Sequence, residues 1–337
     1  MGLTTDRLNR PVRDLRISVT DRCNFRCPYC MPAEVFGEHY KFLPKSEILT
    51  FEEIERLARV FVGHGVKKLR VTGGEPLLRQ GLTELVQRLA KLPVDLSLTT
   101  NGYLLARHAA ALKAAGLHRL TISLDSLDKD VFEKMNGRGH GPEVVLEGLA
   151  AAREAGFGPA KINAVVQRGV NEHTLVELAR HFKGSGHILR FIEFMDVGTV
   201  NGWDLAQVVT KKEILELLGA EFALEPVAPN YAGEVATRFR YKDGSGEIGI
   251  ISSVSEPFCG GCTRARLSPK GELMTCLFGS SGTDLRTPLR NDVTDDELST
   301  LVGSLWSARA DRYSEKRSEH TEFSARRDRI EMFRIGG

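Results

Sequence analysis

Three cysteines lie within eight positions near the start of the chain, in the stretch DRCNFRCPYC (residues 21–30). Cys23, Cys27 and Cys30, the first cysteine group, have the spacing Cys-x3-Cys-x2-Cys, and the nearest histidine, His39, comes nine residues later. Structural zinc normally takes four protein ligands. A four-iron cluster can instead leave one iron without a protein ligand. The pattern therefore favours an iron–sulfur cluster over a zinc site or over buried, inert cysteines.

A second cysteine group repeats this pattern. Cys259 and Cys262 form a Cys-x2-Cys pair, Cys276 follows, and no histidine lies between residues 188 and 319. A lone Cys-x2-Cys pair could be a redox pair or half of a zinc site. Two separate groups of three thiols are better explained by two clusters, each with one iron open to a small molecule. The missing fourth ligand would then be the functional feature.

Length and composition limit the classes of protein that need to be considered. The chain has 337 residues, of which 42% are hydrophobic, enough for one large domain or two ordinary ones. A formal net charge of only +2 argues against a nucleic-acid-binding protein that relies on bulk charge. Because we find neither a secretion signal nor 18 consecutive apolar residues, we expect a cytoplasmic protein with no membrane span.

Short β-rich runs alternate with amphipathic helical stretches up to about residue 220. A helical pattern over 51–65 follows Thr50 and Glu53, which have capping-box spacing. Six such β/α units imply a parallel sheet with helices outside, either an open doubly wound sheet or a partial barrel. The predicted strands are 15–20, 68–72, 96–100, 120–125, 162–167 and 189–194.

The pattern changes after about residue 225. Residues 236–254 and 264–278 each read as two strands around a turn, and a helix is expected within 295–313. A charged tail that we expect to be mobile follows. We therefore divide the chain into 1–225 and 226–337.

Several motifs at strand ends resemble those of radical S-adenosylmethionine enzymes. Cys-x3-Cys-x2-Cys closes the first strand, VTGGEP (71–76) follows the second, and TTNG and SLD follow the next two. The second cysteine group, with TRARLS inside it, and the terminal Gly336-Gly337 resemble the molybdenum-cofactor biosynthesis protein A family, the GTP 3′,8-cyclases. The resemblance runs from about Arg10 to Gly337. One departure is Gly260-Gly261 in the second Cys-x2-Cys pair, where bulkier residues are expected.

This resemblance implies both a fold and a reaction. The fold is α/β, an incomplete (βα)6 TIM-like barrel with a C-terminal β-hairpin and helical region that carries the second cluster. Two 4Fe–4S clusters and S-adenosylmethionine are the cofactors, and a 5′-deoxyadenosyl radical removes the 3′ hydrogen of GTP. The product is 3′,8-cyclo-7,8-dihydro-GTP, in the first step of molybdenum cofactor biosynthesis. The implied partners are a flavodoxin- or ferredoxin-like electron donor and cyclic pyranopterin monophosphate synthase, while a homodimer stays open.

The resemblance also implies roles for individual residues. The S-adenosylmethionine contacts of the family match Tyr29, Gly74, Ser123 and Met195. Taken alone, the tyrosine or the methionine would be interpreted as a core residue. Thr99 matches a nucleotide contact. Arg264 and Arg266 match substrate-binding and catalytic positions that face guanine beside the second cluster. They are two positions apart in a strand and so share one face. Without the resemblance, they would be interpreted as exposed residues at the edge of a hairpin. Gly336 and Gly337 match a tail that enters the active site.

Five cations in the predicted strands could bind the triphosphate of GTP. No Gly-Lys dipeptide occurs, so a Walker motif is excluded. Guanidinium groups match phosphate oxygens well, and alternation with apolar neighbours would direct these side chains into a barrel lumen. Buried cations without a partner are costly, so an anionic ligand is expected. The five residues are Arg16, Lys68, Arg70, Lys161 and Arg190.

Two alternatives remain. Another two-cluster radical enzyme, such as a peptide maturase, would usually carry a longer cysteine-rich C-terminal region. A non-catalytic zinc protein that binds RNA or a protein partner would be colourless and would contain no iron or sulfide.

Overall fold

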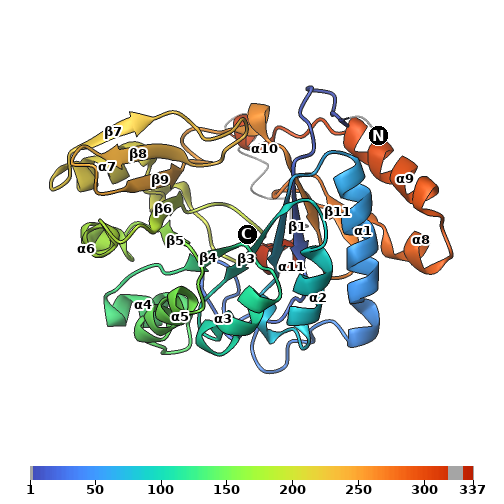
Figure 1. Ribbon diagram of the computed structural model, residues 1–337. Helices are drawn as coiled ribbons and strands as arrows, with labels where there is room; N and C mark the ends of the chain where they lie inside the picture. The colour runs from blue at the N-terminus through green and yellow to red at the C-terminus, as the bar shows by residue number, and fades with distance from the viewer. Residues whose placement is uncertain (1–2, 318–328, 337) are drawn as a thin grey trace.

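Six parallel strands form the central part of the computed structural model, which describes residues 3–317 and 329–336 (Figure 1). Neighbouring strands pair in sequence order, as in a (βα) barrel that does not close. The predicted strands are confirmed to within two residues. Their bounds are β1 Asp14–Ser18, β2 Lys68–Thr72, β3 Asp95–Thr100, β4 Arg119–Ser123, β5 Lys161–Val166 and β6 Ile188–Glu193.

Helices follow these strands and cover their outer face. In the first of them, the side chain of Thr50 accepts a hydrogen bond from the Glu53 amide and Glu53 reciprocates, so the predicted capping box is confirmed. Leu57 and Phe61 bury the apolar stripe of the same helix in the core. The helices are α1 Phe51–Gly63, α2 Leu82–Leu89, α3 Leu105–Ala114, α4 Lys129–Asn136, α5 Glu143–Glu154 and α6 Leu175–Phe182, with 3-10 turns η1 Lys45–Glu47, η2 Pro76–Leu78, η3 Glu172–Thr174 and η4 Leu205–Gln207.

The later strands lengthen the same sheet at both of its edges, giving the order β12-β11-β10-β1-β2-β3-β4-β5-β6-β9-β8-β7. Strand β9 pairs parallel to β6, and β10 pairs parallel to β1. Both predicted antiparallel strand pairs, β8 with β9 and β10 with β11, are confirmed. The bounds are α7 Lys211–Gly219, β7 Leu224–Val227, β8 Thr237–Tyr241, β9 Glu247–Ile251, η5 Cys259–Gly261, β10 Arg264–Leu267, β11 Glu272–Met274 and β12 Thr283–Asp284.

The end of the chain returns to the centre of the molecule (Figure 1). Phe333 and Ile335 are buried, and the Phe333 ring lies 4.8 Å from that of Phe36. Apolar contacts therefore hold the last described residues of the predicted tail against the rest of the protein. For residues 318–328 the expected mobility lies outside the described part of the chain. The last helices are α8 Arg286–Arg290, α9 Asp295–Ser307, α10 Tyr313–Lys316 and α11 Met332–Ile335.

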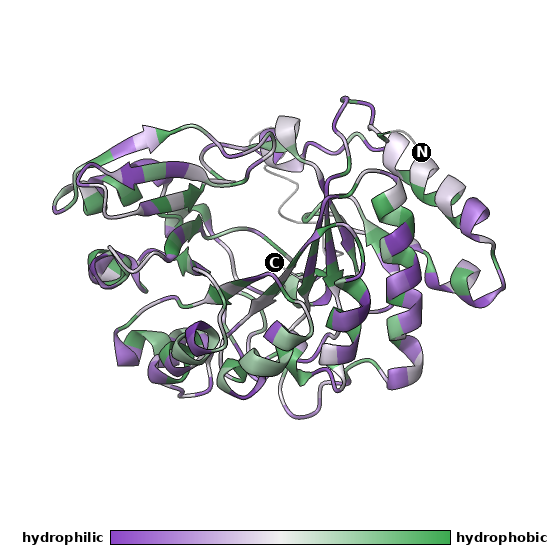
Figure 2. Ribbon diagram, viewed as in Figure 1, coloured by the Kyte–Doolittle hydropathy of each residue, from purple (hydrophilic) through white to green (hydrophobic). Residues whose placement is uncertain are grey.

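The core fills the space between the strands and the outer helices. Leu15 and Ile17 of β1 are fully buried, and the central strands are largely hydrophobic whereas the helices carry polar residues along one side (Figure 2). Because successive side chains of a strand point to opposite faces, Arg16 lies on the other face, toward the lumen. Within residues 3–317 and 329–336 no helix is long and apolar enough to cross a bilayer.

Candidate active site

The first cysteine group lies in the loop after β1 and lines a cavity with an empty volume of about 1010 Å³. All four residues expected to contact S-adenosylmethionine line the same cavity, although they come from four different segments of the chain. The thiols and the expected adenosylmethionine contacts thus border one cavity. These four residues are Tyr29, Gly74, Ser123 and Met195.

Glycines allow the cysteine loop to lie against the loop after β2. A Cβ atom on Gly74 would stand 2.4 Å from the carbonyl oxygen of Arg22, and one on Gly73 would stand 2.7 Å from that of Thr20. The Gly74 amide instead donates to the Thr20 carbonyl at 2.8 Å. The close approach requires glycine, which explains the Gly-Gly pair in VTGGEP.

Burial controls the protonation of the first cysteine group. Burial and the nearby Glu75 raise the pKa of Cys23 to about 12, and burial raises the pKa values of Cys27 and Cys30 as well. Bare thiols here stay protonated, so thiolates form only when a metal centre displaces the protons. Burial also raises the pKa of Glu75 to about 7, and its carboxylate accepts from Thr100 Oγ1 at 2.9 Å.

A buried carboxylate holds the tyrosine of the cysteine loop. The Tyr29 hydroxyl donates to Asp125 Oδ2 at 2.8 Å, and the Val165 amide donates to Asp125 Oδ1 at 2.8 Å. Burial raises the pKa of Asp125 to about 6. Sequence reasoning used the SLD motif that contains Asp125 but did not select this residue.

The second cysteine group lines another cavity, of about 1070 Å³ empty volume. Three arginines face one another across adjacent strands, because Arg16 of β1 stands opposite Arg266 of β10 and Arg70 of β2. The strands therefore place a row of guanidinium groups beside the thiols. The arginines of this cavity wall are Arg16, Arg70, Arg190, Arg264 and Arg266, together with Arg309.

Positive charge in this cavity is only partly compensated by protein groups. Burial and neighbouring guanidinium groups lower the pKa of Arg190 to about 9 and that of Arg266 to about 10, and the pKa of Arg16 is lowered too. The Nε atoms of Arg16, Arg70 and Arg266 are buried and have no hydrogen-bond partner among residues 3–317 and 329–336. Asp14, missed by sequence reasoning, is an acidic residue in this wall, and the arginines lower its pKa although burial opposes them. Such a site favours an anionic ligand.

Neither predicted lysine, Lys68 or Lys161, is among the residues that line the two cavities, although strand alternation places them on the same faces as Arg70 and Asn163, which do. Lys68 Nζ lies 3.0 Å from the Tyr231 hydroxyl and 4.1 Å from the centre of its ring, so its charge is directed to that side chain. Lys161 lies near the arginines of the second cavity. Burial, and to a smaller extent the charge of Arg190, lower the pKa of Lys161 to about 7. Lys68 is the first residue of β2 and Lys161 is the first residue of β5, so both lie at the edge of the barrel wall.

The two cavities adjoin, because Asn163, Ile192 and Met195 line both. Asn163 Oδ1 accepts hydrogen bonds from Nε and Nη2 of Arg190 at 3.0 and 2.7 Å. Thr99, expected to contact the nucleotide, lines the first cavity, and its buried Oγ1 has no hydrogen-bond partner in the described part of the chain. Nothing in the sequence singled out Asn163, which the fold places at this junction.

The chain end reaches the first cavity through Met332 and Phe333. Gly336 has φ +68°, and a Cβ atom there would stand 2.0 Å from Cγ2 of Thr72, another residue of the cavity wall. Only glycine fits at this position. Gly337 lies outside the described residues.

The donor sets fit iron–sulfur clusters better than single metal ions. All six cysteines are free, and each group of three borders a cavity. In the described part of the chain no three His, Cys, Asp or Glu side chains converge closely enough to hold one ion. A cluster does not need such convergence, because its thiolates bind separate irons, and soft thiolates suit iron–sulfur centres.

Comparisons with known proteins agree with this geometry. The Radical SAM superfamily model matches residues 17–182, and the Molybdenum Cofactor Synthesis C model matches residues 187–315. A GTP 3′,8-cyclase of Staphylococcus epidermidis is 50% identical over 335 residues, which cover 98% of each chain. GTP 3′,8-cyclases of Acidothermus cellulolyticus (53% identical, 93% of this chain and 88% of that one) and Xanthomonas campestris pv. campestris (52% identical, 98% and 97%) are similar too.

A solved structure supports the fold alone. Streptococcus suis SuiB bound to S-adenosylmethionine matches with a TM-score of 0.63 and 15% identity, over 90% of this chain and 70% of that chain. Although SuiB is distant in sequence, it shares the arrangement of strands and helices described above.

Proposed function

The chain belongs to the GTP 3′,8-cyclase family of the radical SAM superfamily, and we propose that GTP lies across its two adjoining cavities. It is a radical S-adenosylmethionine enzyme with 4Fe–4S clusters that converts GTP to 3′,8-cyclo-7,8-dihydro-GTP in molybdenum cofactor biosynthesis. In this proposal residues 1–225 carry the first cluster, and residues 226–337 carry the second cluster and the Gly-Gly tail. GTP bridges the two.

One observation carries the proposal. The two cysteine groups open into neighbouring cavities, and a set of buried arginines lines the second cavity. A nucleoside triphosphate has the negative charge that this wall favours, and a ligand bound there would lie next to the first cavity because the two cavities share lining residues. The residues shared by both cavities are Asn163, Ile192 and Met195.

In the first cavity, the cysteine group would hold the cluster that binds S-adenosylmethionine. This cofactor pair, when bound, supplies the 5′-deoxyadenosyl radical that removes the 3′ hydrogen of GTP. The chain itself contributes position and shelter. Tyr29, whose hydroxyl is held by Asp125, would border the adenosylmethionine together with Gly74, Ser123 and Met195, and Asn163 lines the same cavity.

In the second cavity, Arg16, Arg70 and Arg190 would bind phosphate oxygens. Arg190 is already oriented by Asn163, which leaves its remaining N–H groups directed at the ligand. Arg264 and Arg266 line the same cavity as the second cysteine group, where they would flank the guanine. Lys68 and Lys161 add positive charge from the ends of their strands.

The remaining assignments concern Thr99, the tail and the partners. Thr99 would give its free hydroxyl to the nucleotide, and Gly336 and Gly337 would reach the reacting centre as a tail. We further propose that the enzyme works in the cytoplasm, takes electrons from a flavodoxin- or ferredoxin-like donor, and passes its product to cyclic pyranopterin monophosphate synthase.

An isotope experiment tests the function and the placement together. The protein is reconstituted anaerobically with iron and sulfide, then incubated with 3′-deuterated GTP, S-adenosylmethionine and dithionite. Mass spectrometry should find deuterium in 5′-deoxyadenosine and a cyclised guanine nucleotide. Unlabelled 5′-deoxyadenosine with unchanged GTP would refute hydrogen removal from the 3′ position.

A matched pair of variants separates the two cavities. Replacing the second cysteine group with alanine should leave S-adenosylmethionine cleavage measurable and abolish cyclisation. Replacing the first group should abolish both. Equal loss of cleavage in the two variants would contradict the division of roles between the cavities.

A further inference from the structure

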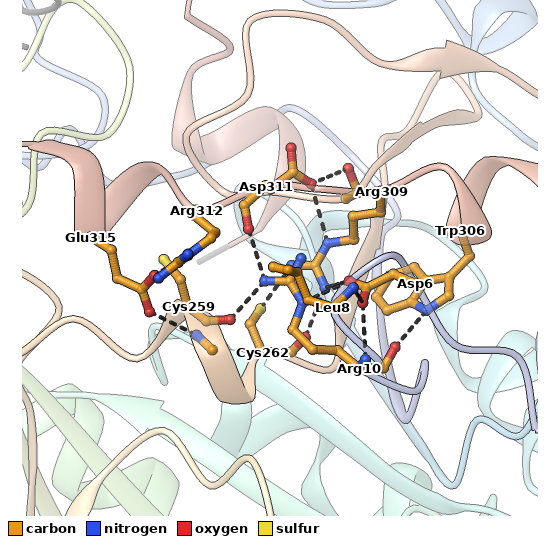
Figure 3. A network of polar contacts seen from close by, with 12 residues as sticks. Asp6, Leu8, Arg10, Cys259, Cys262, Trp306, Arg309, Asp311, Arg312 and Glu315 are labelled. Carbon is orange, nitrogen blue, oxygen red and sulfur yellow. Dashed lines mark hydrogen bonds and ion pairs between the residues drawn. The ribbon is translucent and has the colours of Figure 1, made fainter.

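Two buried arginines bind the loop that carries the Cys-x2-Cys pair of the second group (Figure 3). Arg309 Nη1 donates to the carbonyl oxygen of Cys262 at 2.7 Å, and its Nη2 donates to the Sγ of the same residue at 3.2 Å. Arg10 Nη1 donates to the carbonyl oxygen of Cys259 at 2.7 Å. Their side chains are only 1% and 2% exposed, so both ends of the pair are held from inside the protein.

The guanidinium group of Arg309 is itself fixed. Its Nε donates to Asp311 Oδ2 at 3.2 Å, and its Nη1 lies 3.3 Å from Asp6 Oδ2. The group also lies over the Trp306 ring, 4.7 Å from its centre. Asp6 Oδ2 is shared with Arg10 Nε at 2.6 Å, which ties the two arginines into one network. A planar donor held in this way keeps its N–H directed at sulfur.

We propose that Arg309 is a positioning residue that raises the electron affinity of the second cluster through its hydrogen bond to Cys262 and its charge. The inference rests on the proposed function, in which Cys262 is a cluster ligand. Arg10 and Asp6 serve it by keeping the guanidinium group and the ligand loop in register.

The physical reason is that one-electron reduction adds negative charge to a cluster. Cluster potentials respond to net charge and to hydrogen bonds on the sulfurs. A cationic donor that stays close to a ligand sulfur therefore favours the reduced form. In the first group, Cys23 Sγ instead accepts from neutral donors, the Phe25 amide at 3.4 Å and Asn101 Nδ2 at 3.9 Å. The two clusters should differ in potential for this reason.

The test uses the full chain with the first cysteine group replaced by alanine, so that only the second cluster contributes iron. Arg309→Met removes the charge and the donors, whereas Arg309→Lys keeps the charge but lacks the planar fork. Arg290→Met is the control, because Arg290 lies on the surface and pairs with Glu53. Each protein is reconstituted anaerobically, assayed for iron, and titrated with dithionite while electron paramagnetic resonance follows reduction.

The background protein should bind about four irons per chain. Arg309→Met should keep them while its equilibrium constant for reduction falls about tenfold, which is a midpoint about 59 mV more negative for a one-electron couple. Arg309→Lys should shift less, and Arg290→Met should not shift.

Unchanged midpoints in fully loaded Arg309→Met and Arg309→Lys would overturn the inference. If Arg309→Met loses iron but Arg309→Lys keeps it, the reduction midpoint of Arg309→Lys is the deciding measurement. A more negative midpoint supports the inference, and an unchanged one overturns it. Loss of iron from both, with native circular dichroism, would leave Arg309 with only a role in holding the loop and would overturn the redox role. A background protein without iron would refute the second cluster itself, and the inference with it.

Discussion

Replacing Arg190 by methionine should stabilise the protein in the absence of GTP while it weakens GTP binding. Arg190 is 8% exposed, and burial together with Arg70 lowers its pKa from 12.5 to about 9. The difference of 3.5, at 1.36 kcal/mol for each pKa unit, sets an upper limit of about 5 kcal/mol on the cost of keeping this charge. Loss of the two hydrogen bonds to Asn163 costs about 1–3 kcal/mol. The net gain in unfolding free energy should therefore be at most about 2–4 kcal/mol.

The pH dependence follows from the sign of the shift. The pKa of Arg190 is lower in the folded state than in the unfolded chain, so the unfolded chain binds the proton more tightly. The cost of the charge is fully present below about pH 9 and declines as the pH rises toward 12.5. Measurements at pH 7–8 therefore report the whole effect, and the advantage of Arg190→Met should shrink above pH 9.

GTP binding should change in the opposite direction. A charge-assisted hydrogen bond contributes about 1.5–3 kcal/mol, so removing one that reaches phosphate should raise the Kd for GTP roughly 10- to 150-fold. Because a ligand stabilises the folded state according to its concentration relative to Kd, the unfolding shift that GTP produces should shrink by the same free energy.

The assay is anaerobic urea unfolding of the cluster-loaded protein, with and without saturating GTP. The matched control is Arg240→Met, because Arg240 is an exposed strand arginine paired with Glu225 and should change stability by less than about 1 kcal/mol. The reasoning is refuted if Arg190→Met lowers the unfolding midpoint without GTP and keeps the wild-type GTP shift.

Three further predictions follow from the same site. Replacing the first cysteine group by alanine should leave about half the iron and abolish 5′-deoxyadenosine formation, and persistent formation would contradict the cluster assignment. Gly336→Ala would place a Cβ 2.0 Å from Thr72 Cγ2 at φ +68°, so the chain end should dock less well: cyclised GTP should fall at least about tenfold and the unfolding midpoint should fall modestly, with iron content unchanged. Gly219→Ala, with open space around it, is the control, and full cyclisation by Gly336→Ala would contradict a role for the tail. The pKa of Lys161 is lowered to about 7 and bound GTP favours its charged form, so GTP affinity should fall up to about tenfold per pH unit above pH 7. Calorimetry in two buffers should detect proton uptake on GTP binding in the wild type and no such uptake in Lys161→Met. A wild-type affinity that does not depend on pH would contradict this coupling.

The sequence by itself determined the features that depend on near neighbours. The spacing of Cys23, Cys27 and Cys30 is a local property, and so is the capping box that begins α1. Strand positions followed from short apolar runs, and the alternation of Arg16 with Leu15 and Ile17 indicated that β1 has one polar face. These inferences worked because side-chain direction along a strand has a period of two residues, whatever the strand packs against.

Only the tertiary structure decided which of these elements meet. Parallel pairing of β10 with β1 brings Arg266 opposite Arg16, although the paired residues are 250 positions apart in the sequence. Arg309 reaches Cys262 across 47 positions, and Gly336 reaches Thr72 from the far end of the chain. Such contacts depend on the burial and hydrogen bonding of the whole sheet. Closing a long loop costs little more free energy than closing a short one, so the local spacing of residues does not show which distant segments will meet.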